Sequence, residues 1–188
     1  MGTATTLERE VKLRFDSADA AREAILAAGA TPLHGRRLQE DALLDDAGNT
    51  LRERGCALRV RMENGRSRIT FKGPMQDSVM KLRDEFETVV GDGVLLLRIF
   101  EELGYQVWFR YEKYREEFAH EDVIVAVDET PVGVFVEIEG SEGGITAMAA
   151  AMDRAPADYI LDSYRGLFLK HLAAHGLTGA DMVFDSTQ

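Results

Sequence analysis

Charged and apolar residues alternate along residues 7–15 of this 188-residue chain. Successive side chains of a β-strand point to opposite faces, so the stretch predicts a strand with Leu7, Val11 and Leu13 on one face. The other face carries only charged residues, which are Glu8, Glu10, Lys12 and Arg14. A single strand with a solvated outer face would give the same pattern. The same mixed-charge alternation returns in later strands, and this repetition constrains the fold.

Turn residues and apolar periodicity divide the rest of the chain into hairpins and inserted helices. The predicted strands cover residues 7–15, 33–45, 57–62, 67–72, 81–90, 105–118, 122–129 and 132–139. The predicted helices cover residues 17–28, 92–103, 143–152 and 162–174. Strands joined mostly by hairpins, with helices between them, indicate an α+β fold with an antiparallel sheet.

The helices need the apolar strand faces, so the charged faces must turn away from them. A closed eight-stranded β-barrel, with helices packed outside and charges lining the interior, satisfies both requirements. The expected inward carboxylates are Glu8, Glu10, Glu85, Glu87, Asp128, Glu137 and Glu139, and the expected inward bases are Lys12, Arg59, Arg61, Lys72, Arg83, Lys113 and Arg115. Bases match carboxylates in number there, although the whole chain carries a net charge of −11.

The acidic composition limits the partners of the protein. A net negative surface repels nucleic acid and anionic membranes, and no apolar run is long enough to span a bilayer. Cys56 is the single cysteine, which excludes an internal disulfide and agrees with a cytoplasmic location. We expect one domain over residues 1–188, as a monomer or homodimer, with residues 1–6 and 178–188 flexible.

A charged interior is unfavourable unless its charges are paired or bound to ligands. A network of structural salt bridges is one interpretation. The pairs Glu8/Glu10 and Glu137/Glu139 argue against it, because neighbouring carboxylates on one strand face repel each other unless a cation joins them. Oxygen ligands favour Mg²⁺ or Mn²⁺ over zinc, and arginine matches phosphate oxygens. The pattern therefore indicates metal-dependent chemistry on a polyphosphate.

A series of motifs in one order along the chain supports this interpretation. They are Glu8-x-Glu10-x-Lys12, Leu58-Arg59-Val60-Arg61, Thr70-Phe71-Lys72-Gly73-Pro74, Arg83-Asp84-Glu85-Phe86-Glu87, Lys113-Tyr114-Arg115, Asp128, Phe135-Val136-Glu137-Ile138-Glu139-Gly140 and Asp162-Ser163-Tyr164. Together they resemble the CYTH superfamily, also called triphosphate tunnel metalloenzymes. That family includes class IV adenylate cyclases and thiamine, inorganic and RNA triphosphatases.

The resemblance implies a role for each group of residues. The implied ligands of Mg²⁺ or Mn²⁺ are Glu8, Glu10, Asp128, Glu137 and Glu139. The implied triphosphate-binding residues are Lys12, Arg59, Arg61, Lys72, Arg83, Lys113 and Arg115. The implied catalytic residues are Lys12, Glu85 and Glu87. Lys12 would accept a proton from water if neighbouring cations lower its pKa, and the two glutamates would orient bases or water.

Three functions remain open at this point. A triphosphatase would hydrolyse inorganic triphosphate, ATP or thiamine triphosphate. A class IV adenylate cyclase would convert ATP to cyclic AMP and pyrophosphate, and a third alternative is a polyphosphate-binding module without catalysis. Many relatives place a Tyr-Phe pair where this chain has Ala42-Leu43 after Gln39-Glu40-Asp41. The loss of a candidate contact for an organic headgroup favours hydrolysis.

Overall fold

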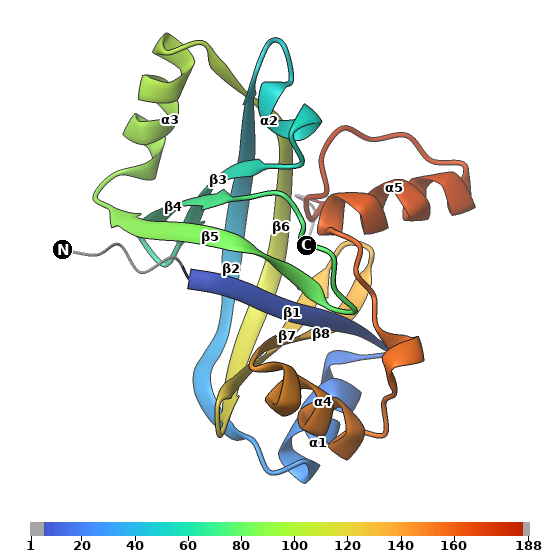
Figure 1. Cartoon of the computed structure of the whole chain (residues 1–188). Coiled ribbons are helices and arrows are strands. Elements are labelled where there is room, and N and C mark those ends of the chain that lie inside the picture. Colours follow the sequence, from blue (N-terminus) through green and yellow to red (C-terminus); the bar gives the residue numbers. More distant parts are fainter. Residues whose placement is uncertain (1–5, 186–188) are drawn as a thin grey trace, which may run out of the picture.

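Eight antiparallel strands close into a barrel in the computed structural model, which describes residues 6–185 (Figure 1). The strands are β1 (Thr6–Phe15), β2 (Thr31–Asp46), β3 (Ala57–Glu63), β4 (Arg66–Lys72), β5 (Lys81–Val90), β6 (Tyr105–His120), β7 (Val123–Thr130) and β8 (Gly133–Gly140). Their order around the barrel is β1-β5-β4-β3-β2-β6-β7-β8, and β8 pairs again with β1. The predicted α+β fold with a closed eight-stranded barrel is confirmed.

The helices begin where the sequence offers a capping side chain. Ser17, Asp92, Ser141 and Ser163 each accept a hydrogen bond from a backbone N–H of the first helical turn. The helices are α1 (Ala18–Ala27), α2 (Thr50–Glu53), α3 (Gly93–Glu102), α4 (Glu142–Ala151) and α5 (Tyr164–His175). The short helix α2 and a 3-10 turn at Pro156–Asp158 were not predicted, because each is too short to show helical periodicity.

The apolar strand faces point outward, as the barrel interpretation requires. The helices α1 and α4 cover β1, β7 and β8, whereas α3 packs against β3, β4 and β6 (Figure 1). The core beneath α1 and α4 includes Val11, Leu13, Ile25, Val125, Val136, Ile138, Ile145 and Met148. These apolar side chains are buried between the helices and the outer face of the sheet. The alternate side chains of the same strands therefore point into the barrel.

One end of the barrel is closed by an aromatic cluster. Tyr164 and Phe168 of α5 pack against Phe109, Tyr111 and Phe135, which come from β6 and β8. No helix among residues 6–185 is long and apolar enough to cross a membrane.

The C-terminal segment contributes to this closed end. Met182 is fully buried, and its backbone exchanges hydrogen bonds with Arg110 and Glu112 of β6. Phe184 packs on Tyr114. Residues 181–184 thus contact β6, whereas the flexibility of the tail stays a prediction and residues 186–188 lie outside the described residues. At the other terminus Thr6 already belongs to β1, and residues 1–5 of the predicted leader are not described.

Candidate functional site

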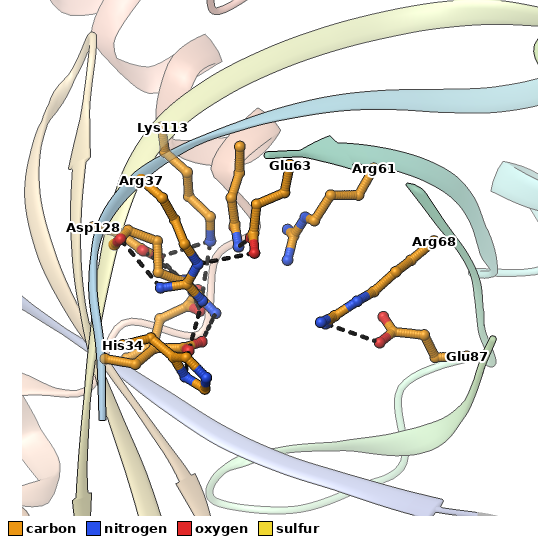
Figure 2. Close-up of polar contacts among 12 residues, drawn as sticks. His34, Arg37, Arg61, Glu63, Arg68, Glu87, Lys113 and Asp128 are labelled. Carbon is orange, nitrogen blue, oxygen red and sulfur yellow. Dashed lines mark hydrogen bonds and ion pairs between the residues drawn. The ribbon is translucent and has the colours of Figure 1, made fainter. Parts of the chain in front are cut away.

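A cavity of about 790 Å³ lies inside the barrel, away from the aromatic end. Arginines and glutamates from five strands line it, and Figure 2 shows several of these side chains converging on one hollow. The ionisable lining residues are His34, Arg37, Arg61, Glu63, Arg66, Arg68, Arg115, Glu117, Asp122, Glu137 and Glu139. The sequence-predicted residues Arg61, Arg115, Glu137 and Glu139 thus reach one common space.

A first charged group joins β1 to β4 and β5. Glu8 accepts a short hydrogen bond from Lys72 and another of 2.9 Å from Arg83 Nε. Glu10 lies 2.9 Å from Lys12 Nζ and 2.7 Å from the buried Lys81 Nζ. Lys72 also lies 2.7 Å from Glu85. Each of these carboxylates is therefore paired with at least one lysine.

A second group surrounds the buried carboxylate of Asp128 on β7. Asp128 accepts hydrogen bonds from Lys113 Nζ (2.8 Å), Arg115 Nε (2.7 Å) and the hydroxyl of Tyr164 (2.5 Å). Arg115 also forms a short contact with Glu137. Tyr164 thus links the closed end of the barrel to the charged interior, and sequence reasoning had not assigned it this contact.

A third group is centred on Asp41 of β2. The guanidinium of Arg61 binds both carboxylate oxygens of Asp41, at 2.9 and 3.1 Å, and Arg59 Nε lies 3.4 Å away. Burial opposes the charge of Asp41, but Arg61 and Arg59 outweigh it and lower the pKa of this carboxyl. Glu87 accepts a hydrogen bond of 2.9 Å from Thr70, which in turn contacts Arg59.

Glu139 differs from the other interior carboxylates because it forms no ion pair with any described residue. Glu139 is exposed to the cavity, yet partial desolvation by the surrounding barrel, followed by repulsion from Glu8, Glu10 and Glu85, raises its pKa to about 7. Desolvation also raises the pKa of Glu85. An added cation would relieve this repulsion, so the donor set fits a hard divalent ion.

The five predicted metal ligands do not form one cluster. Glu10 lies opposite Glu139, which Glu8 also repels, while Asp128 and Glu137 contact Arg115 and Glu137 shares Lys12 with Glu10. Across residues 6–185, no three histidine, cysteine, aspartate or glutamate side chains converge closely enough to hold a metal ion as they stand. The lysines that pair with Glu8 and Glu10 would have to move for these carboxylates to bind one.

The sequence matches the CYTH domain family over residues 6–164. The chain belongs to the CYTH family. A Methanocaldococcus jannaschii protein named as a candidate adenylate cyclase is 31% identical over 136 residues, which cover 72% of this chain and 77% of that protein.

Two solved structures share the CYTH-type barrel seen here. The structure of a candidate adenylate cyclase from Vibrio parahaemolyticus has a TM-score of 0.76 and 20% identity, covering 88% of this chain and 99% of the other. A Hippeastrum protein described as a candidate adenylyl cyclase with a dominant triphosphatase activity has a TM-score of 0.62 and 19% identity, covering 92% and 97%. At this identity, the two structures establish the fold alone.

Lys12 of this CYTH chain lies between the carboxylates of Glu10 and Glu137, and it shares Glu10 with Lys81. Although burial disfavours its charge, Glu10 and Glu137 outweigh that effect and raise the pKa of Lys12. The premise that neighbouring cations lower this pKa is wrong. Burial lowers the pKa of Lys81 to about 8. Burial and the charge of Arg115 lower the pKa of Lys113 to about 8.

Several residues that face the interior of the barrel were not predicted from the sequence. They are Arg37, Asp41, Glu63, Lys81 and Glu117. Each lies two residues from another inward-facing position on its strand, so continuing the period-two pattern to the strand ends would have found them. Their partners, in contrast, come from neighbouring strands and depend on the register of the barrel.

Proposed function

We propose that this CYTH protein is a divalent-metal-dependent triphosphatase that acts on a triphosphate inside the barrel. The observation that carries the proposal is the shared cavity, which brings Arg61 and Arg115 together with Glu137 and Glu139. Arginines suit the charge and the oxygen geometry of phosphate, and carboxylates suit a hard cation beside it. A metal-bound triphosphate needs arginines for its phosphate groups and carboxylates for its cation.

The bases would bind the phosphate chain and neutralise the charge that develops during its cleavage. Arg61 and Arg115 line the cavity directly. Lys113 is not among its lining residues and instead donates a hydrogen bond to Asp128. Lys12 remains charged between Glu10 and Glu137, so it fits a role as a phosphate ligand better than a role as proton acceptor. Glu85 and Glu87 would orient Lys72 and Arg59 through the contacts described above.

The metal site would be built around Glu139 and the facing Glu8 and Glu10, with Mg²⁺ or Mn²⁺ as the ion. A bound divalent ion supplies charge neutralisation for the phosphoryl oxygens. Glu139 forms no ion pair with residues 6–185 and its pKa is raised, so a cation beside it would relieve the repulsion. Asp128 would position Lys113 and Arg115, and Glu137, two residues before Glu139 on β8, would do the same or complete the coordination.

In the proposed reaction, water attacks the terminal phosphorus while the bond to the bridging oxygen breaks. Phosphate and diphosphate are the products of inorganic triphosphate. The arginines stabilise negative charge on the oxygens of the transferred group and of the leaving group, which is the main requirement of phosphoryl transfer.

The cavity lining favours hydrolysis over cyclisation. A cyclase must also hold adenine, and aromatic side chains are a common means of stacking on a base. No phenylalanine, tyrosine or tryptophan is among the described residues that line the cavity. The absence of the Tyr-Phe pair at Ala42-Leu43 points in the same direction.

A substrate comparison tests the proposal. Inorganic triphosphate, ATP and thiamine triphosphate are incubated separately with Mg²⁺ or Mn²⁺, and the phosphate, pyrophosphate and cyclic AMP formed are quantified. We expect metal-dependent release of phosphate, lost in Glu139→Gln and retained in Glu116→Gln, whose side chain pairs with Arg22 outside the barrel. Cyclic AMP from ATP would indicate a cyclase, and binding without turnover would indicate a binding module.

A further inference from the structure

Arg37 is one of two arginines that lie side by side on adjacent strands of the cavity wall. Arg37 on β2 is paired in register with Arg115 on β6, and both line the cavity. The pairing of β2 with β6 is irregular just before Arg37, and such irregularities re-aim side chains. Figure 2 shows Arg37 reaching into the hollow. Like charges directly opposite on neighbouring strands are unfavourable unless an anion lies between them.

A carboxylate of the protein supplies that anion. Glu117 Oε2 lies 2.6 Å from an Arg37 nitrogen, and Glu117 Oε1 lies 4.0 Å from Arg115. The other side of Arg37 is held by Glu63, at 2.9 Å from Nε (Figure 2). The oxygens of Glu117 therefore occupy a position between two guanidinium groups, which is the arrangement that a phosphate group also satisfies.

We propose that Arg37 is an additional phosphate-binding residue, and that Glu117 occupies its anion position until a phosphate group of the substrate displaces it. The inference rests on the proposed function, because it names a further contact of the same substrate. Glu63 ends β3 and Glu117 lies three residues before the end of β6, and both side chains remain partly exposed, so they can turn to solvent when the phosphate enters.

The adjacent residues provide matched controls. Arg36 and Glu116 precede Arg37 and Glu117 in sequence and therefore point to the opposite face of the sheet. Arg36 Nε lies 2.7 Å from Glu129, and Glu116 lies 2.6 Å from Arg22 Nε. Each control removes the same charge and a comparable ion pair from the outside of the barrel.

The test is a double-mutant cycle on the binding of inorganic triphosphate, measured by titration calorimetry in Ca²⁺ with phosphate release checked afterwards. Arg37→Gln should weaken binding by about tenfold. Glu117→Gln should strengthen it by about three- to tenfold, because the competing carboxylate is gone. In the Arg37→Gln background most of that gain should disappear. Arg36→Gln and Glu116→Gln should change the affinity by less than about twofold.

The outcomes separate this inference from the proposed function. A wild-type protein that does not bind triphosphate contradicts both. Binding that Arg37→Gln leaves unchanged overturns the role of Arg37 alone. A full gain from Glu117→Gln in the Arg37→Gln background also overturns it, since the gain would then come from the lost negative charge and not from a freed Arg37. If Arg37→Gln unfolds, equal affinities of Glu117→Gln and Glu116→Gln contradict the inference.

Discussion

Glu139 of β8 lies directly opposite Glu10 of β1, so two carboxylates face each other inside the barrel. Only Glu10 is neutralised, by Lys12 and Lys81. Glu137, two residues before Glu139, lies 2.8 Å from Lys12 and contacts Arg115. The expectation that paired carboxylates repel each other therefore applies to Glu139 and not to Glu137, and the two residues should respond to substitution with opposite signs.

Removing the charge of Glu139 should stabilise the metal-free protein at pH 8. Its pKa is raised from 4.5 to about 7, so the unfolded chain loses this proton at lower pH than the folded protein does. The free energy of unfolding consequently falls as pH rises from about 4.5 to 7. Because Glu139 is exposed to water at the cavity, screening limits the gain of Glu139→Gln to about 1 kcal/mol.

Urea unfolding at pH 8 and pH 4.5 measures this difference. The gain should be present at pH 8 and nearly absent at pH 4.5, where the wild-type carboxyl is already protonated. A loss of stability at pH 8 would show that Glu139 is a structural ion-pair partner.

The substitution Glu137→Gln should destabilise the protein. Burial opposes its charge, but Lys113, Lys12 and Arg115 hold the pKa of Glu137 well below its ordinary value. Its contribution is therefore present above about pH 4.5 and is lost as pH falls below that. Removing one partner of a buried ion pair costs about 3–5 kcal/mol. Thermal unfolding at pH 7 should show a lowered Tm for Glu137→Gln, and a Tm equal to or above that of the wild type would contradict this view of Glu137.

The outline of the barrel could be predicted because alternation fixes which face of each strand is buried. A slip of one residue would move every charge of β1 or β8 into the core beneath α1 and α4. The pairing inside the barrel could not be predicted in this way. That Asp41 binds Arg61, or that Lys12 lies between Glu10 and Glu137, depends on the register between strands.

The contacts of the C-terminal segment could not be predicted for a different reason. Met182 is fully buried and forms an isolated β-bridge with Tyr111. It belongs to a stretch that has neither helical nor strand periodicity. A local sequence pattern cannot predict this contact, because Tyr111 reaches Met182 only when the aromatic end of the barrel has formed.

Loss of the hydroxyl of Tyr164 should weaken the closed end of the barrel without disrupting its packing. The hydroxyl donates to the fully buried Asp128, and the ring lies 4.8 Å from Lys113 Nζ. Tyr164→Phe keeps the ring and leaves the carboxylate one donor short, which should lower the free energy of unfolding by about 1–3 kcal/mol. Urea unfolding measures the loss. Tyr159→Phe, whose hydroxyl makes no hydrogen bond to the described residues, is the control and should have little effect.

Arg61 combines a structural and a binding role, and a second substitution can separate them. Its guanidinium binds both oxygens of the buried Asp41 and also lines the cavity. Arg61→Ala leaves Asp41 with Arg59, 3.4 Å away, as its ion-pair partner among the described residues, which should cost about 3–5 kcal/mol of stability. If Arg61 also binds phosphate, the same variant should weaken the binding of inorganic triphosphate by about ten- to a hundredfold.

The double variant Arg61→Ala/Asp41→Asn distinguishes the two roles. Replacing Asp41 by the neutral amide removes the poorly compensated charge, so stability should recover, whereas the phosphate contact remains lost. Thermal unfolding and calorimetric titration with inorganic triphosphate measure the two quantities on the same samples, and Arg36→Ala removes an arginine from the outside of β2 as the control. Recovery of both would mean that Arg61 acts on binding only through folding. An unchanged affinity in Arg61→Ala would leave Arg61 as the ion-pair partner of Asp41 alone.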